Sequence, residues 1–94
     1  MTANAASVLV VDDEPDLRTL YELTLLREGH RVETAASVQE ARQKLRAQHF
    51  DVVLTDMRLP DGRGLELIME LRDAQRRERC VVMTAYGSAE NAVE

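Results

Sequence analysis

Four oxygen-bearing side chains stand directly after apolar runs of this sequence, where they could share one chemical task. They are Asp12, Asp13, Asp56 and Thr84. Carboxylate oxygens are ligands that Mg²⁺ takes in proteins, and an aspartate can also attack phosphorus to form an acyl phosphate. The candidate chemistry is therefore metal-assisted phosphoryl transfer. In it Asp56, which stands alone, is the nucleophile, and the adjacent pair Asp12 and Asp13 is suited to the metal.

The apolar runs that precede these residues are typical of β-strands. Three runs are continuous and rich in β-branched residues, as in strands that are covered on both faces. The other, "RVETAA", is mixed, as suits a strand near the edge of a sheet. The strands are predicted at 8–11, 32–36, 52–55 and 80–84.

Helical patterns lie between the predicted strands. The first is bounded by Pro15 and Gly29 and carries Leu20 in its apolar stripe, and the second opens on the capping-box pair Ser37 and Glu40. The helices are predicted at 14–28, 38–48 and 64–74, with a fourth beginning at Ser88.

Alternation of strand and helix predicts an α/β fold, a doubly wound parallel sheet with helices on both faces. Ligands of such folds bind beyond the carboxyl ends of the strands. In a strand order that begins 2-1-3-4, the first, third and fourth strands are neighbours, so the three carboxylates and the hydroxyl converge at one edge of the sheet. Like charges held so close destabilise one another unless a cation lies among them, which favours a bound Mg²⁺.

Length and charge narrow the function classes. A chain of 94 residues is one small domain, and its net charge of −5 with scattered basic residues argues against direct binding of nucleic acid. No apolar stretch approaches the ~20 residues that span a membrane, and the first residues do not form a secretory signal. We therefore expect a cytoplasmic protein.

The other chemically versatile residues are expected to have structural roles. Cys80 lies in an apolar run without metal-ligand spacing and is expected to be a small buried hydrophobe. Four basic residues are expected to be solvated: Lys44, Arg76, Arg77 and Arg79. The two histidines, His30 and His49, are expected to have structural roles.

Several familiar motifs are absent. A Ca²⁺ loop that starts at Asp12 would need glycine and glutamate where Leu17 and Leu23 stand. Gly62 and Gly64 are not followed by the third glycine of a dinucleotide fingerprint. The sequence also contains neither a Gly-Lys-Ser/Thr phosphate loop nor a Gly-x-Ser-x-Gly nucleophile elbow.

The residues resemble a known family. "VLVVDDEPDLR", "VVLTDMRLPDGRGLEL" and "VVMTAYGSAENAVE" are similar to the receiver domain of two-component response regulators. The last two are most similar to the branch of sigma-54-dependent, NtrC-like transcription activators. The resemblance covers nearly the whole chain, so residues 1–94 are expected to be one receiver domain with the flavodoxin-like (CheY-like) fold, whose sheet has five strands in the order 2-1-3-4-5.

The resemblance also implies roles for single residues. Asp56 would be phosphorylated by a sensor histidine kinase, and Asp12, Asp13 and the backbone carbonyl of Arg58 would hold Mg²⁺ beside it. The hydroxyl of Thr84 would turn toward the phosphoryl group. Such a domain is not an enzyme in its own right, since it switches the output of a downstream transcription-activating module.

The sequence departs from the family pattern at its end. Receivers also use a lysine and an aromatic residue on a fifth strand, but the only lysine here is Lys44, and Tyr86 is expected to shape the loop before the fourth helix. We expect a receiver that is truncated before strand five, with four of five strands, and that binds Mg²⁺ weakly and phosphorylates poorly. One edge of its sheet, and one face of the sheet and of the first helix, are expected to be uncovered. This edge, or the fourth helix, is expected to support self-association.

Two other function classes stay open. One is a Mg²⁺-dependent phosphatase or phosphotransferase that forms an aspartyl phosphate, although such enzymes usually need Asp-x-Asp after the first strand and this sequence has Asp12-Asp13-Glu14. The other is a receiver-like interaction module that never takes phosphate. Its sign would be the loss of an acid, and all three acids are present.

Overall fold

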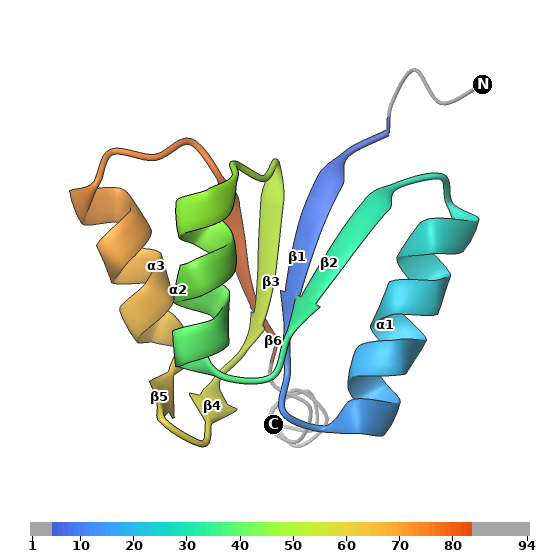
Figure 1. Ribbon diagram of the computed structural model, residues 1–94, viewed down its shortest axis with the longest axis horizontal. Coiled ribbons are helices and arrows are strands. Elements are labelled where there is room, and N and C mark those ends of the chain that lie inside the picture. Colours follow the sequence, from blue (N-terminus) through green and yellow to red (C-terminus); the bar gives the residue numbers. More distant parts are fainter. Residues whose placement is uncertain (1–4, 84–94) are drawn as a thin grey trace, which may run out of the picture.

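The computed structural model describes residues 5–83, and four strands within this range form one parallel sheet. The order is β2-β1-β3-β6, which confirms the predicted neighbours of the first, third and fourth long strands and the position of the mixed strand at an edge. Figure 1 shows the sheet between its helices. The strands are β1 (Ser7–Val11), β2 (Arg31–Ala35), β3 (Val52–Asp56) and β6 (Arg79–Met83).

Three helices flank the sheet, with α1 on one face and α2 and α3 on the other (Figure 1). They confirm the helices predicted within the described range, and the fourth helix, predicted from Ser88, lies outside it. No helix of residues 5–83 is long and apolar enough to cross a membrane. The bounds are α1 (Pro15–Arg27), α2 (Val38–Ala47) and α3 (Gly64–Asp73).

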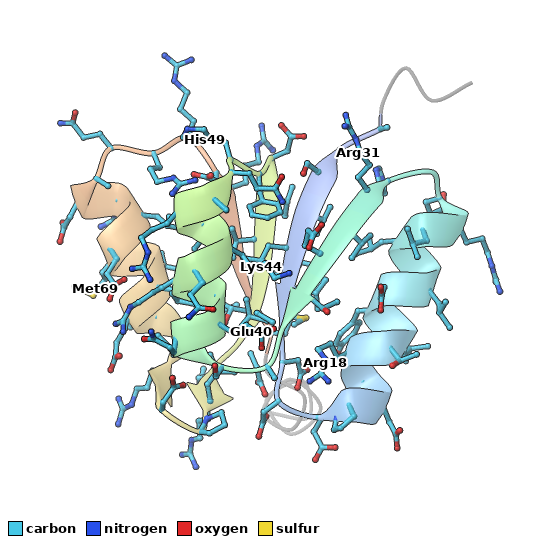
Figure 2. All side chains as sticks on the ribbon, in the orientation of Figure 1. Arg18, Arg31, Glu40, Lys44, His49 and Met69 are labelled. Carbon is cyan, nitrogen blue, oxygen red and sulfur yellow. The ribbon has the colours of Figure 1, made fainter. Side chains whose placement is uncertain are left out.

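Local signals in the sequence account for where the first two helices begin and end. Pro15 occupies the first turn of α1, where its missing N–H is no loss, and Gly29 follows the helix with a φ of 92° that favours glycine. The Ser37 hydroxyl accepts a hydrogen bond of 3.1 Å from the Glu40 N–H. The Glu40 carboxylate, seen beside the start of α2 in Figure 2, accepts one of 2.9 Å from the Ala36 N–H. The predicted capping box therefore forms, with its second bond one residue before the cap.

The core lies between the sheet and the pair α2 and α3. Side chains of a strand alternate between the two faces, so odd-numbered residues of β1 and β3 point to this side. Burying this apolar surface is the main force that holds the two helices on the sheet. The buried cluster consists of Leu9, Val11, Ala35, Val38, Ala41, Leu45, Phe50, Val53, Leu59, Leu67 and Leu71.

The opposite face is only half covered. Helix α1 packs on β1 and β2, so β1 is covered on both faces while β3 is buried only at alternate residues and Val81 of β6 is 46% exposed. The prediction that β3 and β6 are covered on both faces is therefore wrong. The predicted packing of Leu20 is also wrong, because this side chain is 56% exposed on α1. Within residues 5–83, the expected uncovered face of the sheet and of the first helix is present.

A small hairpin that the sequence did not predict follows β3. Strands β4 (Arg58–Leu59) and β5 (Gly62–Arg63) pair antiparallel around a Pro-Asp-Gly turn at 60–62. Only two residue pairs form, too few for an apolar-run signal. The hairpin connects β3 to α3 below the carboxyl end of the sheet in Figure 1.

Arg76 was expected to be solvated, but its side chain is mostly buried and binds Glu78 and the end of α2. The Arg76 side chain is 16% exposed, and its Nη2 lies 2.6 Å from the carboxylate of Glu78, which is 1% exposed. Arg76 also donates to the carbonyls of Leu45 and Gln48 at the end of α2, and Glu78 accepts a 3.0 Å hydrogen bond from the Phe50 N–H. These partners compensate for removing both charges from water.

The other minor expectations have mixed outcomes. Lys44 is not simply solvated, because its Nζ lies 2.9 Å from a carboxylate oxygen of Glu33 across α2 and β2 (Figure 2). His30 is structural, since its Nδ1 accepts a 3.0 Å hydrogen bond from the Ala6 N–H, whereas His49 is 85% exposed. Cys80 is only partly buried, against the edge of the core.

Candidate functional site

Parallel pairing brings three acids to one edge of the sheet. Val11 pairs with Thr55, so Asp12, the next residue after β1, comes beside Asp56 at the end of β3. One carboxylate oxygen from each of Asp12, Asp13 and Asp56 lies within 4.8 Å of the others. We call these three residues the acidic cluster. The predicted convergence of the three carboxylates is therefore present.

The members of the acidic cluster differ in exposure. Asp12 is 2% exposed, Asp56 is half-buried and Asp13 is exposed. The Asp12 Oδ1 accepts a 2.9 Å hydrogen bond from the Glu14 N–H, and the Asp56 Oδ1 accepts one of 2.8 Å from the Met57 N–H. Each of these two carboxylates therefore keeps a second oxygen that is free of these bonds.

The electrostatics of the acidic cluster call for a cation. Partial burial raises the pKa of Asp56, the charges of Asp12 and Asp13 raise it further, and the hydrogen bond from the Met57 N–H opposes them. Among the ion pairs formed by residues 5–83, none includes a member of the cluster. Three converging carboxylate oxygens are a donor set that suits a hard divalent cation such as Mg²⁺.

Two further residues were predicted to act beside the cluster, and the structure describes one of them. Arg58 is the first residue of β4, two positions after Asp56. Thr84 lies outside the described residues, so its predicted role stays a prediction. Its neighbour in sequence, Met83, is the residue of β6 that pairs with Asp56.

Backbone contacts that sequence reasoning missed hold the cluster in place. Arg18 projects from α1 toward the end of β1 (Figure 2), and its Nη1 donates a 2.8 Å hydrogen bond to the carbonyl of Asp12. Gly64 approaches β3 so closely that a Cβ there would collide with the Asp56 carbonyl and would lie 2.7 Å from the Thr55 Oγ1. The only sign of this close contact in the sequence was the glycine itself, since a glycine can mark a close approach of two backbones. From the sequence, Gly64 was considered only as part of a nucleotide-binding motif, which it does not fit.

A wound parallel sheet with an acidic cluster at its carboxyl edge is the architecture of phosphorylation-dependent signalling receivers. The family "Response regulator receiver domain" matches residues 8–94. The chain belongs to this family.

Curated relatives support the same assignment and its branch. The chain is 45% identical over 86 residues to the response regulator protein PilR of Pseudomonas aeruginosa, covering 92% of this chain and 19% of that protein. It is 36% identical over 93 residues to the transcriptional regulatory protein GlrR of Escherichia coli, covering 99% and 21%. These regulators confirm the sigma-54-dependent, NtrC-like branch. The chain spans about a fifth of their length.

Solved structures confirm the CheY-like fold. The response regulator TrrA of Thermotoga maritima, in complex with Mg²⁺ and BeF, is 34% identical with a TM-score of 0.81, over 90% of this chain and 74% of that chain. A response regulator of Burkholderia pseudomallei with a phosphorylated aspartic acid, a calcium ion and citrate is 32% identical with a TM-score of 0.78, over 85% and 47%.

Proposed function

We propose that Asp56 accepts a phosphoryl group from a sensor histidine kinase, with Mg²⁺ held by Asp12, Asp13, Asp56 and the backbone carbonyl of Arg58. The observation that carries this proposal is the convergence of the acidic cluster, whose three carboxylates take part in no ion pair among residues 5–83. Membership of the receiver family favours this function over the phosphatase that the sequence left open.

Exposure and hydrogen bonding favour Asp56 as the acceptor. Asp12 is almost fully buried and Asp13 is not on a strand, whereas Asp56 ends β3 between the ends of two neighbouring strands. The Met57 N–H holds one Asp56 oxygen at 2.8 Å, which orients the carboxylate and leaves the other oxygen to react. The Gly64 contact fixes the Asp56 backbone.

The transfer is a displacement at phosphorus. An Asp56 carboxylate oxygen attacks the phosphorus of a phosphohistidine, the new O–P bond gives an acyl phosphate, and the P–N bond breaks with its electron pair passing to the imidazole nitrogen. When bound, Mg²⁺ supplies positive charge that offsets the charge on the phosphoryl oxygens. Asp12 and Asp13 contribute by holding that cation beside the acceptor.

The phosphorylated state would differ mainly in charge. A phosphoryl group adds a charge of about −1.5 to −2 near neutral pH. In this proposal the Thr84 hydroxyl turns toward that charge, and the segment from Ala85 onward follows it. Self-association then changes through the fourth helix or the edge of the sheet. The signal then passes to a transcription-activating module of a longer protein, in line with the names and lengths of the relatives. In this proposal that longer protein is cytoplasmic.

Phosphorylation with a small donor tests the proposal directly. The full chain is incubated with acetyl phosphate in Mg²⁺ or in EDTA, and intact mass is measured. We expect slow and incomplete addition of one phosphoryl group, dependent on Mg²⁺ and absent from Asp56→Asn. Asp73→Asn, the same change at an exposed position at the end of α3, is the control and should take up phosphate like the wild type. Uptake that persists in Asp56→Asn, or no uptake by the full-length protein, would overturn the assignment.

A further inference from the structure

The carboxylate of Asp61 links the β4–β5 hairpin, which follows Asp56, to the start of α2. Asp61, in the turn of the β4–β5 hairpin, accepts a 2.8 Å hydrogen bond from the Val38 N–H and a 2.9 Å hydrogen bond from the Gln39 N–H. These hydrogen bonds, first that of Gln39 and then that of Val38, hold the pKa of Asp61 below its usual value. The hairpin therefore supplies the N-terminal cap of α2 from outside the helix.

Asp61 completes a cap that α2 only partly makes for itself. The first N–H groups of a helix have no partner within it. Ser37 satisfies the Glu40 N–H, and Asp61 satisfies the two N–H groups before it. The side chain of Asp61 thus joins two structural units that are far apart in sequence.

The β4–β5 hairpin is too short to be stable without contacts to the rest of the domain. It contains only two residue pairs, and an isolated two-stranded hairpin is marginal in water even when it is longer. Its remaining anchors are Leu59, which enters the core, and the 3.0 Å hydrogen bond from the Gly64 N–H to the Met57 carbonyl. Asp61 is the anchor at the turn.

The turn also leaves no space for a side chain at Gly62, beside the start of α2. A Cβ at Gly62 would lie 3.1 Å from Cγ2 of Val38, which is fully buried, and 2.8 Å from Oε1 of Glu66. The turn therefore lies in close contact with the start of α2, and the hydrogen bonds of Asp61 oppose its movement away from that helix. Together they define one position for the hairpin that begins at Arg58.

We infer that Asp61 is a positioning residue for the metal site: by fastening the hairpin to α2, it holds the backbone of Arg58 where its carbonyl can serve as a Mg²⁺ ligand. The inference rests on the proposed function. Asp61 acts through the hairpin and does not contact the cation. Partners of this kind, one step removed from the ligands, commonly set metal affinity.

Two matched variants separate positioning from simple loss of a helix cap. Asp61→Ala removes the bonds between hairpin and α2, whereas Ser37→Ala removes a cap bond of the same helix without touching the hairpin. Asp61→Asn keeps one acceptor oxygen and serves as the conservative variant. Mg²⁺ affinity of the full chain is measured by calorimetry, and the melting temperature is measured without metal.

We expect both alanine variants to melt at lower temperature than the wild type. In Asp61→Ala the Kd for Mg²⁺ should rise about tenfold, whereas in Ser37→Ala it should stay within about twofold of the wild-type value. The Kd of Asp61→Asn should lie between these two. Wild-type affinity in Asp61→Ala, or an equal loss in Ser37→Ala, would refute the positioning role and leave the proposed function intact. If the wild type itself bound no Mg²⁺ and Asp56 took no phosphate, both proposals would fall.

Discussion

Removing the charge of Asp56 should stabilise the metal-free protein. At the 4.8 Å limit of the acidic cluster, each pair of like charges costs about 0.9 kcal/mol in a water-like dielectric. Asp56 has two such neighbours, partial burial strengthens the repulsion and dissolved salt weakens it. The expected gain for Asp56→Asn in EDTA is about 1–2 kcal/mol, which in a domain of this size corresponds to a melting temperature roughly 5–15 °C higher.

Mg²⁺ should reduce this difference in stability between the two proteins. A cation that binds only the folded wild type at ten times its Kd stabilises it by about 1.4 kcal/mol through mass action. The Asn variant has lost one ligand and should gain little. Thermal melts of both proteins in EDTA and across a Mg²⁺ series therefore give melting temperatures that differ in metal-free buffer and approach each other as the cation is added.

Asp16→Asn is the control for this experiment. It removes the same charge from the exposed first turn of α1, where a carboxylate favours the helix dipole, so its melting temperature should fall slightly. Its response to Mg²⁺ should match that of the wild type. An Asp56→Asn variant that melts no higher than the wild type in EDTA would refute the repulsion argument. Equal Mg²⁺ stabilisation of both proteins would refute the metal site.

Three more predictions concern contacts around the cluster and at the far end of the sheet. Gly64→Ala should destabilise the fold by at least the ~1–3 kcal/mol of an overpacked site, and should weaken Mg²⁺ binding because the Asp56 backbone must move; normal binding would contradict this. Arg18→Met loses the hydrogen bond to the Asp12 carbonyl and should cost about 0.5–1.5 kcal/mol in denaturant melts, with no effect expected if that bond is absent in solution. Glu78→Gln should cost about 1.5–3 kcal/mol at pH 7, with a deficit that shrinks in acid.

The acid dependence of the Glu78 variant follows from the direction of its pKa shift. Burial alone would raise the pKa of Glu78, but hydrogen bonds from the Arg76 side chain and the Phe50 N–H outweigh it and lower the value. A lowered folded pKa gives stability that is present above the unfolded value of about 4.3 and is lost as the pH falls through the folded value. Wild-type and variant melts should therefore converge only below about pH 4.3. A constant difference down to strong acid would show that the carboxylate charge is not the cause.

The strands, helices and acidic cluster were predictable because each depends on short-range patterns. Apolar runs gave the strands, the capping pair Ser37 and Glu40 gave a helix start, and parallel topology then forced Asp12 and Asp56 together. Family resemblance added the role of the Arg58 carbonyl, which no pattern of spacing provides.

Features that depend on tertiary partners were missed. Asp61 lies in a Pro-Asp-Gly turn, where an aspartate is expected for local reasons, and nothing there shows that it caps a helix whose first residue is 23 positions earlier. Arg76 sits in a basic stretch that is typical of solvated loops, and its burial depends on Glu78 and on the end of α2.

β3 lies inside the sheet, so its backbone should open less often than the hairpin that follows it. Its amides are hydrogen-bonded between β1 and β6, so they should exchange with deuterium mainly when the whole domain unfolds. Amides of the two-pair hairpin can exchange through brief local opening. The Asp56 carboxylate thus belongs to the slowest-exchanging part of residues 5–83, while the neighbouring hairpin can open briefly and close again many times within the lifetime of the folded domain.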